Sequence, residues 1–175
     1  MYENGTGFPQ AHAEAAQWHR IAAAQGHANG QCTLGWMYAN GTGVPQDHAE
    51  VARWHRLAAD QECALAQCVF GRTHANGTGV AQDHAEAVRL CGLGADQGVA
   101  DAQFDLGLMH MNGAGVAQDF AEAVVRCDRL AADQGLALAQ YNLGRMHDNG
   151  DGVQQNFGEA ARLHRLAADQ GLADA

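Results

Sequence analysis

The sequence predicts an all-α fold, a solenoid of stacked helical hairpins. A glycine-rich turn recurs along the chain, and its copies begin at residues 4, 40, 76, 112 and 149, which makes the spacings 36, 36, 36 and 37. The segments between the turns are rich in alanine, the residue with the highest helix propensity. Both prolines, Pro9 and Pro45, fall within the predicted turns. A fixed period of this length indicates one helical hairpin copied several times.

The chain is expected to begin and end inside a repeat. Met1-Tyr2 matches Met37-Tyr38, the end of a first helix, so residues 1–26 form a partial repeat whose second-type helix covers about residues 10–25. These ends predict a fragment of a longer protein. We expect one repeat domain over residues 1–175, in which four full repeats and the start of a further one cover residues 27–62, 63–98, 99–135, 136–171 and 172–175.

The first helix of each repeat has a face of small residues. It is expected over Ala28–Tyr38, with copies at 64–74, 100–110 and 137–147. Ala28, Cys32 and Gly35 lie at i, i+4 and i+7 and therefore share a face. A glycine inside a helix costs about 1 kcal/mol relative to alanine. Its recurrence at positions 35, 71, 107 and 144 predicts a close approach of a neighbouring helix, where a side chain would not fit.

The second helix of each repeat begins with a capping signal. Asp47 is a favoured N-cap residue and Glu50 follows three positions later, in the form of a capping box. The helix is expected to direct Trp54, Leu57 and Ala58 inward. Copies of the capping pair are Asp83 with Glu86, Asp119 with Glu122 and Asn156 with Glu159, and copies of position 54 are Trp18, Leu90 and Leu163.

Glycines also stand at the C-terminal ends of the second helices. They stand at positions 98, 135 and 171, where a left-handed residue is wanted, and Glu62 replaces the glycine once at a local cost. Gly92 and Gly94 lie inside a second helix and together cost about 2 kcal/mol of helix propensity. The following repeat has one extra residue around 124–126, which a bulge could absorb. We therefore expect the middle of the chain to be its least regular part.

The net charge and the residue types that are absent exclude several classes of function. The net charge is −10, from 20 acidic residues and 10 arginines, and neither lysine nor serine occurs. This balance disfavours nucleic acid and anionic membrane surfaces as partners, and it excludes serine nucleophiles, Ser–Lys pairs and Schiff bases. No apolar run is long enough to span a membrane and residues 1–5 are not a signal peptide, so we expect a cytoplasmic protein.

Neither the cysteines nor the histidines predict a reactive site. The five cysteines are odd in number and include no CxxC pair, which favours reduced, mostly buried thiols: Cys32, Cys63, Cys68, Cys91 and Cys127. The ten histidines fall in repeat registers, so stacked copies lie about 9–10 Å apart. That separation is too large for ligands that share one zinc ion. We expect no metal, no cofactor and no catalytic residues.

At this point the pattern resembles the Sel1-like repeat, a family related to the tetratricopeptide repeats but with a longer period. The resemblance covers essentially the whole chain. Departures are His74, His110 and His147 in place of tyrosine, and Leu90, Cys127 and Leu163 in place of tryptophan. The best-matching repeat carries the family residues Ala28, Leu34, Gly35, Tyr38, Gly41, Gly43, Val44, Asp47, Trp54, Ala58 and Ala59.

The resemblance implies a right-handed α/α superhelix that acts as an adaptor or scaffold for protein complexes. A cysteine-rich branch of the family has disulfide-linked repeats and is associated with β-lactam binding or hydrolysis. That alternative needs cysteines paired within each repeat, whereas here Cys63 and Cys68 are five residues apart and the last two full repeats hold no such pair. A further alternative is a recruiting segment of a larger multidomain protein.

The partner surface is expected on the concave side, which the first helices of a solenoid line. Positions 33 and 36 point away from the Gly35 face and differ among the copies. We expect a protein or peptide partner, no nucleic acid, no membrane insertion, and a monomer that could stack end to end through its incomplete terminal repeats. The candidate residues are Trp36, Thr33, Arg72, Val69, Asp105, Leu108, Asn142 and Arg145.

Overall fold

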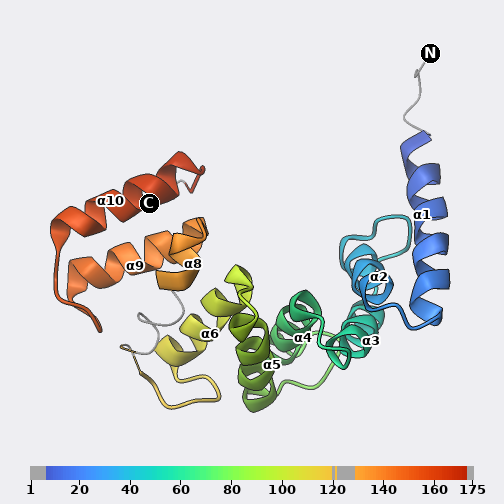
Figure 1. Ribbon diagram of the computed structural model, residues 1–175, viewed down its shortest axis with the longest axis horizontal. Helices are drawn as coiled ribbons and strands as arrows, with labels where there is room; N and C mark the ends of the chain where they lie inside the picture. The colour runs from blue at the N-terminus through green and yellow to red at the C-terminus, as the bar shows by residue number, and fades with distance from the viewer. Residues whose placement is uncertain (1–6, 120, 122–128, 173–175) are drawn as a thin grey trace. The chain divides into compact units, whose positions relative to one another are not determined.

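The structure, a computed structural model, describes residues 7–119, 121 and 129–172. All regular secondary structure in these ranges is helical, which confirms the predicted class (Figure 1). Two compact units divide the chain, one over residues 1–83 and the other over residues 84–175. The helices are α1 (Gly7–Ala24), α2 (Ala28–Asn40), α3 (His48–Ala59), α4 (Ala64–Asn76), α5 (His84–Asp96), α6 (Ala100–Asn112), α8 (Arg129–Asp133), α9 (Ala137–Asn149) and α10 (Phe157–Asp169).

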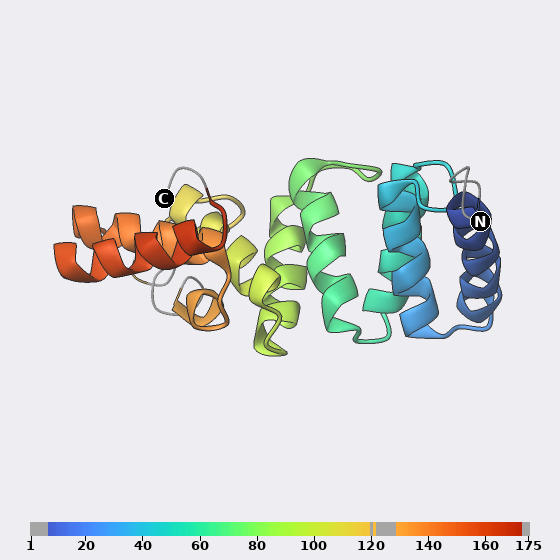
Figure 2. The ribbon, with the colours of Figure 1, turned by 90° about the horizontal axis from the view of Figure 1, so that it is seen from above.

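In the first unit, each helix packs against the next one along the chain. Helix α1 packs on α2, α2 and α3 form a hairpin, and α3 packs on α4. Figure 2 shows these helices, coloured blue to green, side by side. Ala23, Leu34 and Trp54 form a buried cluster at the meeting of α1, α2 and α3, and Tyr38 packs against it. Hairpins therefore stack in sequence order, as a solenoid requires.

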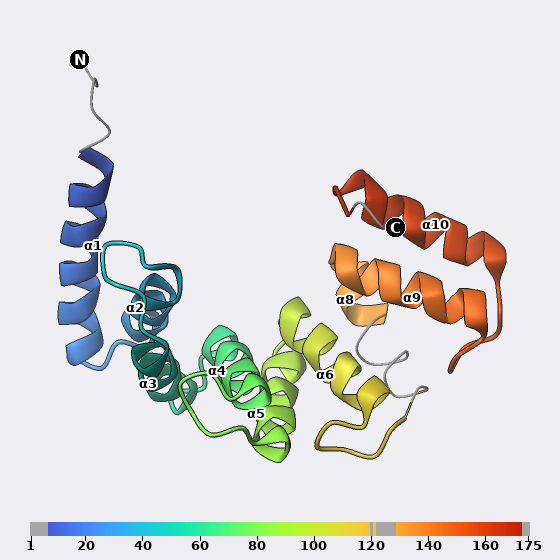
Figure 3. The same cartoon turned by 180° about the vertical axis from the view of Figure 1, so that it is seen from behind.

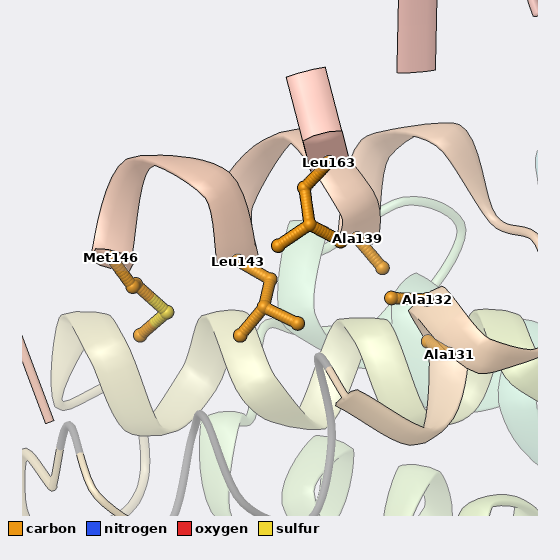
Figure 4. Close-up of a cluster of buried hydrophobic side chains, with 6 residues drawn as sticks. All are labelled: Ala131, Ala132, Ala139, Leu143, Met146 and Leu163. Carbon is orange, nitrogen blue, oxygen red and sulfur yellow. The ribbon is translucent and has the colours of Figure 1, made fainter. Parts of the chain in front are cut away.

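The second unit repeats this arrangement. Helix α5 packs on α6, α8 packs on both α6 and α9, and α9 runs beside α10 (Figure 3). Its buried core is small in side-chain volume, because three of the six residues are alanine: Ala131, Ala132, Ala139, Leu143, Met146 and Leu163. Figure 4 shows Leu163 of α10 directed toward Leu143 and Ala139 of α9. The extra residue around 124–126, and with it the expected bulge, lies outside the described residues.

The first helices begin at the predicted residues and run two residues further than predicted, to the asparagine before the turn. Each ends in a left-handed glycine, of which Gly41 is typical, with φ 65° and a backbone N–H that donates to the carbonyl of Met37. Copies of this glycine stand at positions 77, 113 and 150. A left-handed residue costs glycine no steric strain, which explains its recurrence in the turn.

Two expectations about inward-facing residues are wrong. Trp54 and Ala58 are buried, but Leu57 lies on the flank of the same helix and is 36% exposed. Leu90 and Leu163 are buried like Trp54, whereas Trp18 is 71% exposed. The cause is packing, because α2 covers Trp54 and no described first-type helix stands in that place beside Trp18.

The expected irregularity at Gly92 and Gly94 is not observed, because α5 continues through both residues. Gly94 is buried, so a side chain added there would have to be accommodated in a packed interior. A Cβ atom built on Gly92, in contrast, meets no atom within 4 Å. Packing therefore keeps α5 intact, and the cost that a substitution can remove is the low helix propensity of Gly92.

Gly92→Ala is expected to raise the free energy of unfolding by about 1 kcal/mol, because alanine is favoured in a helix and restricts the unfolded chain. Urea unfolding of the wild type and the variant, followed by circular dichroism, measures the change. Gly94→Ala is the matched control, since the same propensity gain is opposed by burial. A lower stability of Gly92→Ala than of the wild type would contradict the prediction.

Candidate functional site

In α3 the predicted N-cap residue accepts hydrogen bonds, but only one half of the predicted capping box is present. Asp47 Oδ1 accepts from the backbone N–H groups of Ala49 and Glu50 at 2.9 and 3.2 Å. The reciprocal bond of a capping box does not form, because the N–H of Asp47 donates to the carbonyl of Tyr38 across the turn. Glu50 is therefore available to accept from Arg53 and from Trp54 Nε1. The capping-box interpretation of Glu50 is wrong in this respect.

In three of the turns, the second glycine docks on the preceding repeat. Gly79 has φ 77°, and a Cβ atom built there would collide with the carbonyl of His48, the first residue of α3. Gly43 meets the carbonyl of His12 in the same way, and Gly115 meets that of His84. The turns thus connect two helices and also hold neighbouring repeats together. This result supports the interpretation of the turn as a structural element and not as a ligand loop.

Two of the mid-helix glycines, Gly35 and Gly144, make room for an imidazole. A Cβ atom on Gly35 would lie 2.5 Å from His55 Cε1, and one on Gly144 would lie 2.8 Å from His164 Cε1. The predicted close approach is confirmed at both positions, although the neighbour is a side chain and not the backbone of a helix. His55 is 2% exposed and its Nδ1 lies 2.8 Å from the carbonyl oxygen of Val51. Burial lowers the pKa of His55, which favours the neutral ring.

Buried glutamines connect successive helices, and sequence reasoning missed this role. Gln31 Nε2 donates to the carbonyl of Ala23, and Gln31 Oε1 accepts from Gln61 at 2.8 Å. The same pair of bonds recurs around Gln103 and around Gln140. Each glutamine therefore ties a first helix to the end of the preceding second helix and to the end of its own partner. The recurrence of glutamine at one position of every repeat was the available signal.

The cysteines occupy the places expected of core residues. Cys32, Cys68 and Cys91 are buried, Cys63 is half-buried, and no disulfide joins any two of these four. Burial raises the pKa of the Cys32 thiol to about 11, and the neighbouring Cys63 adds to the rise. Cys127 lies outside the described residues. A thiol with so high a pKa is a poor nucleophile at neutral pH.

The candidate partner residues all reach the surface to some extent. Trp36 is 55% exposed, and Arg72 and Arg145 are exposed as well. The others are half-buried: Thr33, Val69, Asp105, Leu108 and Asn142. On α2 the neighbouring residues Cys32, Leu34, Gly35 and Met37 are buried, so Trp36 stands on the face opposite the core.

Each unit holds half of these candidates. The first unit carries Thr33 and Trp36 on α2 and Val69 and Arg72 on α4. The second unit carries the other four on α6 and α9. Within the described ranges, no group of three or more His, Cys, Asp or Glu side chains is placed to hold a metal ion. None of the described helices is long and apolar enough to cross a membrane.

Comparison with known proteins identifies the repeat. The family model described as Sel1 repeat matches residues 1–27, 28–63, 64–99, 100–125 and 137–172. A search of curated proteins found no match. Among solved structures, a protective antigen of uropathogenic Escherichia coli that displays an SLR fold is 34% identical, with a TM-score of 0.82 over 91% of this chain and 34% of that chain.

Two further solved structures share the fold. A Sel1 repeat protein from Oxalobacter formigenes is 31% identical, with a TM-score of 0.85 over 91% of this chain and 63% of that chain. A protein from Klebsiella pneumoniae is 23% identical, with a TM-score of 0.59 over 91% of this chain and 79% of that chain, and shows likeness of fold alone. The chain therefore spans about a third of the first of these relatives and less than two thirds of the second.

Proposed function

The chain belongs to the Sel1 repeat family, and from this membership we propose that it is a scaffold that binds a partner protein or peptide on the outward face of its first helices. Sel1 repeat proteins are in general protein-interaction scaffolds and are typically non-enzymatic. No disulfide joins the described cysteines, which favours this function over the disulfide-linked, β-lactam-binding alternative.

The observation that carries the proposal is the exposure of Trp36. A tryptophan that is 55% exposed on a helix with a buried opposite face leaves a large apolar area in water. Tryptophan and arginine are the residues most enriched at binding hot spots, and position 36 and its copies hold Trp36, Arg72, Leu108 and Arg145. The copies differ while the buried face is kept, as expected of positions fitted to a ligand.

The double variant Trp36→Ala/Arg72→Ala is expected to weaken partner binding by about 30-fold or more, which corresponds to the loss of a hot spot of about 2 kcal/mol. A partner is first captured from the source organism with the wild type, and its affinity for each purified variant is then measured by titration calorimetry. Circular dichroism establishes that the fold is unchanged.

Trp18→Ala is the matched control for this experiment. Trp18 is also tryptophan and is 71% exposed, but it lies on α1, a second-type helix. The proposal requires that Trp18→Ala binds like the wild type. Equal affinities of the wild type and the double variant would remove the proposed surface.

A further inference from the structure

The last hairpin contains a cavity of about 300 Å³ between α8, α9 and α10. Among the described lining residues, Leu143 and Leu163 supply apolar walls, and Figure 4 shows the side chain of Leu163 directed toward α9 beside Leu143. Arg129, Glu159 and Arg162 supply charged groups to the same cavity. A volume of this size lies at the lower end of the range of small-molecule sites.

The equivalent place in the first unit is filled by two aromatic side chains of the protein itself. Residues 109 positions apart are equivalent between the two hairpins, so Trp54 corresponds to Leu163 and Tyr38 to His147. Trp54 is 7% exposed and packs with Leu34, the equivalent of Leu143. The last hairpin thus has smaller side chains at both positions, and the cavity lies where the larger ones would be.

Polar groups in the first unit hold the tryptophan ring on two sides. Trp54 Nε1 donates to Glu50 Oε2 at 2.8 Å. The guanidinium carbon of Arg53 lies 4.6 Å from the centre of the indole ring, a cation–π contact. Arg20 donates to the hydroxyl of Tyr38 at 3.0 Å at the edge of the same cluster.

All three partners of the aromatic pair are retained in the last hairpin. Glu159, Arg162 and Arg129 are the equivalents of Glu50, Arg53 and Arg20, and all three line the cavity. Arg162 pairs with Glu159 at 2.6 Å, as Arg53 pairs with Glu50. The ring that these groups hold in the first unit is absent from positions 163 and 147.

We propose that this cavity binds an indole ring, with the ring N–H donated to Glu159, one ring face under the guanidinium of Arg162, and the other against Leu143 and Leu163. The ligand is either a free indole compound or the tryptophan side chain of a peptide, because both present the same ring. The hydrogen bond from Arg162 lowers the pKa of Glu159, with smaller contributions from His147 and Arg129, so the carboxylate stays ionised as an acceptor.

Titration calorimetry with three probes tests the site. Indole is expected to bind the full chain once, with a Kd on the order of 1 mM or below for a ligand of this size. 1-Methylindole lacks the N–H and is expected to bind several-fold more weakly. N-acetyltryptophanamide distinguishes the sources, because binding of this probe indicates a peptide side chain and its exclusion indicates a free indole. No saturable binding of either indole or the amide would overturn the proposal.

Two variants link the binding to the cavity. Leu163→Trp fills it with the side chain found at position 54 and is expected to abolish indole binding without a loss of thermal stability. Glu159→Gln is expected to weaken indole binding by about three- to tenfold, because a charged acceptor is replaced by a neutral one, and to leave 1-methylindole unaffected. Glu86→Gln is its control, since Glu86 pairs with Arg89 in the same way and does not line the cavity.

The reverse substitution gives an independent readout. Trp54→Leu removes the ring from the first unit and is expected to create a second indole site, so that the stoichiometry rises to two or indole raises the melting temperature of the variant more than that of the wild type. Retained wild-type affinity in a folded Leu163→Trp variant would overturn the proposal. If Glu159→Gln and Glu86→Gln weakened indole binding equally, the proposed role of Glu159 would be overturned.

Discussion

Gly79→Ala is expected to lower the free energy of unfolding by about 2–5 kcal/mol. Two costs combine at this position: the left-handed backbone, with φ 77°, disfavours any residue with a Cβ by about 1–2 kcal/mol, and the Cβ atom collides with the carbonyl of His48. A close-packed contact with main-chain atoms relaxes only if a helix moves, which costs a further 1–3 kcal/mol or so. Equilibrium urea unfolding, followed by circular dichroism, measures the loss.

Gly41→Ala separates the two costs. Gly41 has a similar φ of 65°, but a Cβ atom there meets nothing closer than 3.7 Å. We expect a loss of only about 1–2 kcal/mol, from the backbone conformation alone. If both variants lose the same stability, the turn does not dock on the preceding repeat in the way described above.

Gly35→Ala is expected to destabilise the protein by about 2 kcal/mol, although alanine has the better helix propensity. The added Cβ would lie 2.5 Å from His55 Cε1, and His55 is buried and held by Val51, so the ring cannot swing into solvent. Overpacking of this kind costs about 1–3 kcal/mol. Thermal and urea unfolding of the single variant measure the net effect.

A double-mutant cycle identifies His55 as the obstacle. His55→Cys introduces the residue that stands at the equivalent position, Cys91, where it is buried. The double variant Gly35→Ala/His55→Cys is expected to lose less stability than the sum of the two single losses, by about 1 kcal/mol or more. Strictly additive losses would show that the ring is not what excludes a side chain at position 35.

The positions of the helices could be predicted from the sequence because the signals are local and repeated. The first helices start at the predicted alanines, and Asp47 caps α3 as expected. The hydrogen-bond partners of Glu50 could not be predicted. They depend on the folded turn, which brings the carbonyl of Tyr38 to the N–H of Asp47. The capping-box motif involves residues of one helix end only, whereas here a second helix, α2, supplies the acceptor for the N–H of Asp47.

The candidate partner surface was predictable in its exposure but not in its function. Helical geometry turns Trp36 away from the face of Gly35, and Trp36 is exposed while Gly35 is buried. The role of the surface in binding stays a prediction. The cavity was signalled by two substitutions, Leu163 for tryptophan and His147 for tyrosine, each of which considered alone weakens a contact. Only the packing shows that they lie together and share retained polar neighbours.

The docking of the turn glycines also bears on how such a chain lengthens. Gly43, Gly79 and Gly115 each rest on main-chain atoms, so the contact does not depend on which side chain the preceding repeat carries there. Gln31 likewise donates to a main-chain carbonyl. A duplicated repeat would therefore fit its new neighbour without compensating substitutions. Gene duplication could extend the array first, and later divergence could adapt individual repeats to ligands.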